Sequence, residues 1–323
     1  SNFDNATLTN HDFFISNKAF FFDLGVWPEE SPVDDRGQKA GTDRETLIAL
    51  MHSMYTNTKG DIFQIGGFTP WVWKYTNHGH AGGGHGGVDT EWEYARIISA
   101  FNGIMDADAL GISGMANASF YQHFPLKKHY KQNPKPTTAS LKKKGLILED
   151  GTPARKTYVC FYIGDYDSAA WFNRHVPLFW NDPAHGKIPA AWAFNPTLDQ
   201  RAPHVMHYVR TKQAKNDWFI YGDSGAGYLN PGMLIEVNRK TLSGLPDGMD
   251  TWRKYNKRYS TLYDLSITGF IIDGHSPGME EPGLEAYLKF SKDGIVGQKV
   301  SAQAIYKDTM PVVRMKTDLD GQP

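Results

Sequence analysis

The sequence predicts an α/β fold of parallel strands and intervening helices, and three observations predict it. Short apolar runs recur along the 323 residues, and each leads into Gly, Pro or Asp. Helical patterns follow most of these runs, which favours βα units. No Gly-x-Gly-x-x-Gly dinucleotide fingerprint opens the chain. We therefore predict a (β/α)8-like barrel of TIM type, irregular or with a degenerate unit, rather than a doubly wound sheet.

The predicted strands are short apolar runs bounded by turn-forming residues. They are residues 19–22, 62–65, 118–121, 158–163, 188–193, 218–221, 267–272 and 311–315. Cys160 is the single cysteine and lies inside the fourth run. It excludes an intramolecular disulfide, and we expect a buried thiol.

The predicted helices carry apolar residues at helical spacing, as Leu47, Ile48 and Met51 do in the first of them. They are residues 44–55, 92–105, 168–179, 203–211, 249–263 and 282–290. We expect one barrel-like catalytic domain over residues 1–323, with long loops at 66–91 and 124–156.

Composition favours a neutral substrate. With 34 Lys and Arg against 35 Asp and Glu, the net charge of −1 gives no bulk electrostatic reason to expect nucleic acid or an anionic membrane as partner. No apolar run approaches the ~18 residues of a membrane span. The first residues lack the basic and apolar regions of a signal peptide, so the sequence has the character of a processed protein or fragment.

Acidic residues that follow predicted strands are the candidate catalytic groups, because the carboxyl ends of parallel strands converge on one rim. Glycoside hydrolysis needs such a pair, one carboxyl protonated and the other ionised. The alternative for a single residue is a helix cap, as for Asp167. The Asp165-x-Asp167 spacing also gives a weak indication of a Ca²⁺ site, although we expect no required cofactor. The candidates are Asp167, Asp223, Asp273, Asp165 and Glu91.

The glycine-rich loop at 222–231 is the most informative segment. Gly222, Gly225 and Gly227 allow positive φ angles and close approach of the backbone to a ligand. Tyr228 would be held rigidly there, as a stacking face or a hydroxyl donor. A serine esterase is an alternative, but Ala226 stands where the Gly-x-Ser-x-Gly nucleophile elbow needs its second glycine.

The candidate substrate contacts are mainly aromatic, since aromatic rings suit the apolar faces of sugars, although we expect most of the 43 aromatic residues in the core. His78, His80 and His85, in the loop after the second predicted strand, are open to three interpretations: ligands of Zn²⁺ or Cu²⁺, substrate contacts, or inert loop residues. We expect no metal ligand among the candidate site residues. The predicted substrate contacts are Trp71, Trp73, Lys74, Trp171, Tyr228 and His275.

Four motifs resemble those of the putative glycoside hydrolases named for a Gly-x-Gly-Tyr-x-Tyr-Pro (GxGYxYP) motif. Residues 225–231 read Gly-Ala-Gly-Tyr-Leu-Asn-Pro, with Asn230 in place of the second tyrosine. Residues 165–168 read Asp-Tyr-Asp-Ser and are followed by Trp171, similar to the Asp-Gly-Asp-Asn core of the family. Residues 192–196 read Trp-Ala-Phe-Asn-Pro, and the fourth motif is Trp-Lys-Tyr at 73–75 with Glu-Trp at 91–92. The likeness spans roughly residues 60–275.

The resemblance implies a barrel-type catalytic domain, a polysaccharide or glycoconjugate substrate, and a secreted, periplasmic or cell-surface location. Two alternatives remain. One is a non-catalytic carbohydrate-binding protein on the same fold. The other is a polysaccharide lyase, in which Tyr228 or a loop histidine is the base and a lysine of the basic stretch at 127–144 neutralises a uronic acid. That stretch is typical of a solvated loop, with a contact surface for an acidic sugar as the second interpretation.

Overall fold

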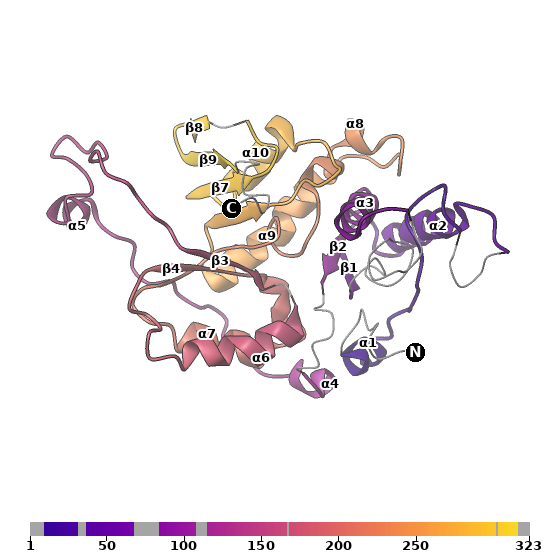
Figure 1. Cartoon of the computed structure of the whole chain (residues 1–323), viewed down its shortest axis with the longest axis horizontal. Helices are drawn as coiled ribbons and strands as arrows, with labels where there is room; N and C mark the ends of the chain where they lie inside the picture. The colour runs from indigo at the N-terminus through magenta and orange to yellow at the C-terminus, as the bar shows by residue number, and fades with distance from the viewer. Residues whose placement is uncertain are drawn as a thin grey trace.

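A computed structural model of the chain describes residues 10–31, 37–67, 84–107, 115–166, 168–301 and 303–315, with the side chains at 165, 166, 303 and 304 outside the description. Helices α1, α2 and α3 lie with β1 and β2 at one side of the molecule, and strands β3 to β9 with their helices form the rest (Figure 1). The helices are α1 (His11–Ser16), α2 (Thr42–Asn57), α3 (Gly87–Ser99), α4 (Ala118–Tyr121), α5 (Thr138–Lys143), α6 (Ala169–Trp180), α7 (Pro203–Thr211), α8 (Glu236–Arg239), α9 (Met249–Tyr263) and α10 (Glu280–Leu288), with the 3-10 turns η4 (Pro196–Asp199) and η5 (Pro231–Leu234).

The strands of the described residues form three small sheets. β1 (Phe63–Gly66) pairs in parallel with β2 (Gly103–Asp106). β3 (Tyr162–Tyr166), β4 (Ala190–Phe194) and β5 (Asp217–Phe219) form a parallel sheet in that order. The third sheet has the order β6-β7-β9-β8, and only its β8–β9 pair is antiparallel. Its strands are β6 (Ile267–Ile271), β7 (Gly294–Gly297), β8 (Gln303–Tyr306) and β9 (Met310–Arg314).

Two isolated bridges join these sheets. Tyr221, just beyond β5, bridges Thr268 of β6 in parallel, so β5 and β6 are neighbours. Tyr228 bridges Met105 of β2 in the antiparallel sense, and both backbone hydrogen bonds of the pair are present, at 2.8 and 3.1 Å. The glycine-rich loop therefore connects the amino-terminal part of the molecule to the rest.

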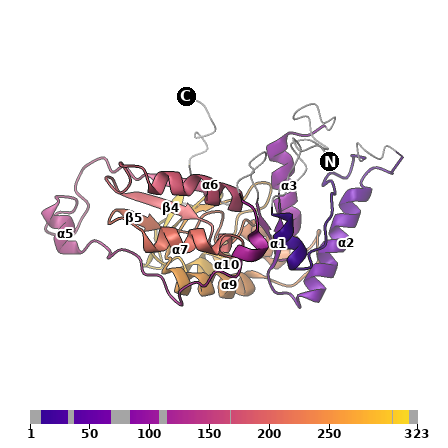
Figure 2. The same ribbon diagram turned by 90° about the horizontal axis from the view of Figure 1, so that it is seen from below.

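Each of the two parts of the molecule is stabilised by a cluster of buried apolar side chains from its own helices and strands. Phe172 of α6, Trp252 of α9 and Tyr287 of α10 are fully buried in the larger cluster around β3 to β7. Leu47 of α2 and Ile97 of α3 belong to a second cluster over β1 and β2. Figure 2 shows α6 and α7 side by side, with α5 projecting from the end of the molecule opposite α2.

The prediction of a (β/α)8-like barrel is wrong. The strands form sheets of two, three and four members, and among the described residues they do not close into a barrel. Closure needs every strand to pair on both sides with matched tilt and register. Within the described segments, β3 pairs with β4 alone, and the antiparallel β8 ends the carboxy-terminal sheet.

The predicted helices and strands agree with the structure better than the predicted architecture does. The predicted helices 203–211 and 249–263 have the bounds of α7 and α9, and six predicted strands overlap β1, β3, β4, β5, β6 and β9. Residues 118–121 form the helix α4 instead of a strand, and residues 19–22 lie outside any strand. Cys160 is exposed rather than buried, because the run at 158–163 enters the ladder only at Tyr162.

Candidate active site

The loop after β5 makes a tight turn with a strained backbone. Asp223 and Ser224 have φ angles of 45° and 73°, left-handed conformations that cost a non-glycine residue of order 1–3 kcal/mol each. At Gly225, whose φ is 146°, a Cβ would lie 2.5 Å from Oδ1 of Asn256. The turn therefore requires glycine at 225, and its strain must be offset by the contacts of its neighbours.

Ser224 supplies those contacts. Its backbone N–H donates to the Phe270 carbonyl at 2.7 Å, and its Oγ accepts from the Ile272 N–H at 2.9 Å. The Tyr287 hydroxyl donates to the Ser224 carbonyl. Because Ser224 is fully buried, its hydroxyl fixes the turn to the end of β6 and is not presented as the nucleophile of a serine esterase.

Asn195, at the end of β4, orients Asp223. The Asn195 Oδ1 accepts three hydrogen bonds, from the Thr197 N–H at 3.1 Å, the Thr197 hydroxyl at 2.8 Å and the Gly227 N–H at 3.0 Å. This fixes which way the amide faces, and its NH2 group points to Asp223 Oδ2 at 3.5 Å. The Asp223 side chain is 6% exposed. Two sequence motifs, at 192–196 and 222–231, thus meet at this carboxylate.

Asp273 follows β6 and is fully buried. Its Oδ2 accepts from the Lys299 N–H at 2.8 Å, and its own N–H donates to the Gln298 side chain at 2.8 Å. Oδ1 has no hydrogen-bond donor among the described residues. Burial raises the pKa of the Asp273 carboxyl to about 6, against the lowering effect of the Lys299 contact.

The two aspartates stand at the carboxyl ends of neighbouring parallel strands. The Ser224 contacts to Phe270 and Ile272 fasten the turn that carries Asp223 to the strand that ends at Asp273. Of the predicted catalytic residues, these two are the pair that the described structure places on adjacent strands.

His275 lies on the same β6 loop and faces the first turns of α3. Its Nε2 is 3.5 Å from an Asp89 oxygen, and its Nδ1 is 3.7 Å from a Glu93 oxygen. The Trp92 ring meets the His275 ring edge-on at 5.7 Å, and Gly274 packs so closely on Trp92 that a Cβ would lie 2.9 Å from it. The predicted contact residue His275 therefore connects the β6 loop to the amino-terminal part.

Asp89 and Glu93, rather than the predicted Glu91, are the acids of α3 that lie beside His275. Glu93 is 6% exposed and accepts from Arg96 at 2.6 and 2.7 Å, which raises the pKa of the Arg96 guanidinium. Glu91 is half-buried on the same helix. Helical spacing could have distinguished them, because position 93 shares the face of the buried Ile97, four residues further along.

Tyr228 and Asn230 are both buried in the core. The Tyr228 ring is 2% exposed and packs with the cluster over β1 and β2, so stacking on a sugar would require it to be uncovered. Asn230 donates to the Ile272 carbonyl and accepts from the Ser276 hydroxyl, both at 2.9 Å. The residue that replaces the second tyrosine of the motif therefore ties the glycine-rich loop to the β6 loop.

The remaining predicted residues are only partly described. Trp171 is half-buried on α6 with its ring 4.5 Å from that of His175, and Ser168 is the cap of that helix. Residues 84–107, 115–164 and 168–301, with the other described side chains, hold no group of three His, Cys, Asp or Glu arranged for a metal ion. The predicted residues outside the described part are Asp167, Trp71, Trp73, Lys74 and the side chain of Asp165.

Sequence reasoning missed Asp106, at the end of β2. Its carboxylate pairs with Arg201 at 2.8 Å, and both side chains are buried. Arg201 also donates to the Ala107 carbonyl at 3.1 Å. The Asn102-Gly103 pair was the available signal, because it marks the turn between α3 and the short strand that ends at Asp106.

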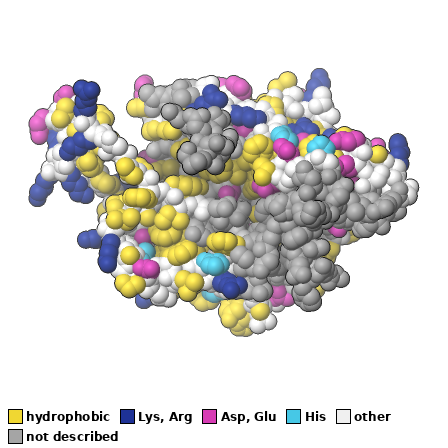
Figure 3. Space-filling model, in the orientation of Figure 1, with side chains coloured by type: hydrophobic (Ala, Val, Ile, Leu, Met, Phe, Trp, Pro, Cys, Tyr) yellow, Lys and Arg dark blue, Asp and Glu magenta, His cyan; other side chains and the backbone are white. Residues whose placement is uncertain are grey.

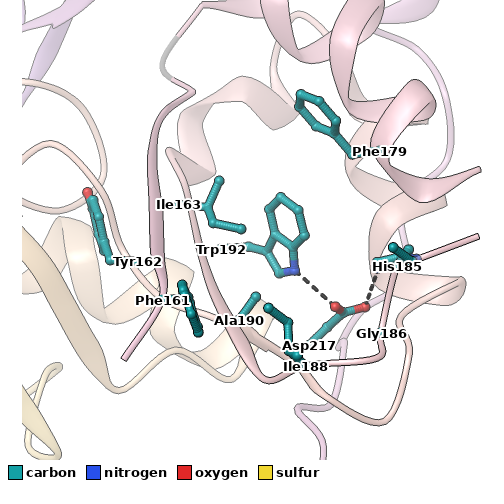
Figure 4. A pocket seen from close by; sticks show the side chains of 11 residues that line it. Phe161, Tyr162, Ile163, Phe179, His185, Gly186, Ile188, Ala190, Trp192 and Asp217 are labelled. Atoms are coloured by element: carbon teal, nitrogen blue, oxygen red, sulfur yellow. Dashed lines mark hydrogen bonds and ion pairs between the residues drawn. The ribbon is translucent and has the colours of Figure 1, made fainter. Parts of the chain in front are cut away.

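A cavity of about 240 Å³ lies at the opposite ends of β4 and β5, whose first residues Ala190 and Asp217 line it. Figure 4 shows Asp217 between Trp192 and His185, which contact its two oxygens at 3.0 and 2.9 Å. Both carboxylate oxygens are thus engaged by protein groups. The cavity is separate from the strand ends that carry Asp223 and Asp273.

Comparison with known proteins agrees with the motifs. A sequence model described as the GxGYxYP putative glycoside hydrolase C-terminal domain matches residues 155–322, just over half of the chain. No curated protein matches. A solved structure titled a putative hydrolase from Bacteroides thetaiotaomicron VPI-5482 is 19% identical with a TM-score of 0.41, over 65% of this chain and 36% of that one. The chain thus spans about a third of that protein.

None of the described helices is both long enough and apolar enough to cross a bilayer. The motif at 225–231 and the aspartates at 223 and 273 all fall inside the matched segment. The chain therefore belongs to the GxGYxYP family of putative glycoside hydrolases, whose C-terminal domain covers residues 155–322.

Proposed function

We propose that this chain is a glycoside hydrolase of a polysaccharide or oligosaccharide, with Asp273 as the acid and Asp223 as the ionised carboxylate. Membership of the family supports hydrolysis of a glycosidic bond. The strand-end positions of the two aspartates support their roles, because paired carboxyls in different environments carry out this chemistry.

The observation that carries the proposal is the environment of Asp273. The carboxyl is buried, its pKa is raised to about 6, and Oδ1 accepts no hydrogen bond from a described residue. Below pH about 6 the group holds its proton. A protonated carboxyl with one oxygen that accepts no hydrogen bond is suited to give its proton to a departing glycosidic oxygen.

Asp223 would act from the neighbouring strand. The Asn195 NH2 group faces its carboxylate at 3.5 Å. Asp223 then either attacks the anomeric carbon or takes a proton from the water that does. In both courses the bond from the anomeric carbon to oxygen breaks, the leaving oxygen receives the Asp273 proton, and a hydroxyl from water ends on the anomeric carbon.

Aromatic groups near the β6 loop are suited to hold a sugar beside these carboxyls. Trp27 stacks on His85 with ring centres 3.6 Å apart, and its edge faces His275 at 6.3 Å. Because Asp273 has no exposed surface, substrate binding must uncover its Oδ1. Trp71, Trp73 and Trp171 remain predicted sugar platforms, and a polysaccharide substrate favours a secreted, periplasmic or cell-surface location.

The test is the appearance of new reducing ends from a polysaccharide panel with Asp273→Asn and Asp223→Asn. Each substitution should lower kcat/KM by about 10²–10⁴-fold. The wild-type rate should fall as the pH rises through about 6, because Asp273 then loses its proton. Asp199→Asn is the matched control: Asp199 is also buried with a pKa of about 6, but it pairs with Tyr263 at 2.8 Å.

Full activity of both strand-end variants would overturn the assignment. Thermal stabilisation of the wild type by a polysaccharide that yields no new ends would favour a non-catalytic binding protein instead.

A further inference from the structure

The segment at 127–156, here called the basic arm, concentrates the positive charge of the chain. It holds nine Lys and Arg against two acidic residues, a net charge of +7, so the other residues carry −8 of the total of −1. Figure 1 shows α5, at the centre of the arm, standing away from the body, and Lys and Arg side chains crowd the same projection in Figure 3. The near-neutral total therefore hides two oppositely charged regions.

The arm is a folded unit rather than a loose loop. Thr137 caps α5 by accepting from the Ser140 N–H at 3.1 Å. A small hairpin follows, with a bridge between Ile147 and Pro153 and a 2.8 Å hydrogen bond from Leu148 N–H to the Thr152 carbonyl. These contacts order the backbone that carries the charges.

Few of these charges are neutralised by the described protein. Lys135 pairs with Asp293, and Lys142 pairs with Glu149 at 3.1 Å. No other cation of the arm has an ion pair with a described residue.

The two legs of the arm bring their free cations together. Lys143 and Lys144 end α5, and Lys156 returns beside them, with its Nζ 3.2 Å from the position a Cβ would take on Gly145. All three side chains are exposed. The last turn of α5 favours one or two cations through the helix dipole, but that does not require Lys156 from the other leg.

We propose that the basic arm is an attachment site for an anionic polysaccharide, a chain bearing carboxylate or sulfate groups. A net charge of +7 on this one segment attracts a polyanion and releases its counterions. Eight of the nine cations are lysines, which bind as point charges rather than as the bidentate forks that recognise single phosphates. The choice of a polysaccharide rests on the proposed function. The site lies apart from the strand ends that carry Asp223 and Asp273.

A lipid surface is the other polyanion to distinguish. An amphipathic membrane-binding helix needs a broad apolar face. The six residues of α5, Thr-Ala-Ser-Leu-Lys-Lys, include no buried residue and only one large apolar side chain, Leu141. The helix of the arm is therefore cationic without an apolar face for insertion, and Leu148 of the hairpin is the one exposed large hydrophobic residue of the arm.

The experiment is a binding titration of the full chain with heparin as sulfated chain, polygalacturonate as carboxylated chain, dextran as neutral chain and phosphatidylglycerol vesicles. Both acidic polysaccharides should bind, with affinity falling steeply between about 50 and about 200 mM salt. The triple variant Lys143→Gln, Lys144→Gln, Lys156→Gln should weaken binding by about tenfold or more.

The control is Lys18→Gln, Lys59→Gln, Lys240→Gln, which removes the same charge from exposed positions elsewhere and should change affinity by less than about twofold. Equal weakening by both triples, or binding of vesicles with no binding of either acidic polysaccharide, overturns the proposal. Because the measurement is binding and not turnover, failure of the hydrolase assignment would leave this result unaffected.

Discussion

The carboxyl ends of β5 and β6 and the basic arm hold ionisable groups in opposite ways. Asp223 and Asp273 are 6% and 0% exposed, and backbone or amide N–H groups contact them. Lys143 and Lys144 are exposed and have no ion pair with a described residue. Burial makes protonation depend on a few neighbours, whereas exposure leaves charge screened and additive. The first arrangement suits chemistry at one atom, and the second suits attraction over a distance.

The largest effect should come from the buried pair Asp106 and Arg201. Arg201→Met leaves the Asp106 carboxylate buried without its cation, so the free energy of unfolding should fall by about 3–5 kcal/mol in a urea titration. The double variant Asp106→Leu, Arg201→Met should recover much of that loss. If the free energy of unfolding of Arg201→Met falls by less than about 1 kcal/mol, the buried charge of Asp106 at the end of β2 is not decisive for stability.

A smaller effect should come from Asp273. The folded protein binds this proton more tightly than the unfolded chain, because the pKa rises from 3.8 to about 6. Its contribution to stability is therefore lost as the pH rises from about 4 to about 6. Relative to Asp273→Asn, the wild type should lose at most about 3 kcal/mol over that range, measured by denaturant unfolding at each pH.

The control for this titration is Asp308→Asn, at an exposed left-handed position that asparagine also adopts. Its stability should follow the wild-type pH curve. A pH-independent difference between the wild type and Asp273→Asn would mean that Asp273 is not held protonated.

The smallest effect should come from the arm. Removing the charges of Lys143, Lys144 and Lys156 should change the free energy of unfolding by less than about 0.5 kcal/mol, since exposed charges without partners contribute little. Thermal unfolding at low and high salt would measure it. A loss of more than about 1 kcal/mol in the free energy of unfolding would mean that these lysines stabilise the fold. The contrast with the buried aspartates at the strand ends would then not hold.

The sequence allowed local elements to be predicted, but not their assembly. The periodicity of α7 and α9 is strong because one face of each helix is buried. β7 was missed because four residues with a glycine at each end give no pattern. Whether strands close into a barrel depends on pairing between distant segments, which no local pattern records.

The candidate site divides in the same way. Asp223 and Asp273 could be predicted because each follows an apolar strand directly. The roles of Asn195 and Glu93 could not, since each depends on a contact across the fold, with Gly227 or Asp223 in one case and His275 in the other.

The left-handed backbone at Asp223 has a consequence for reading related sequences. Asparagine adopts this conformation about as easily as aspartate, and glycine more easily, whereas other side chains are strained there. Loss of the acid at 223 would therefore leave the turn intact while removing the carboxylate. A relative with Asn or Gly at this position would be expected to keep the turn and lose the carboxylate, so under the proposed function this one residue separates candidate enzymes from candidate binding proteins among the homologues.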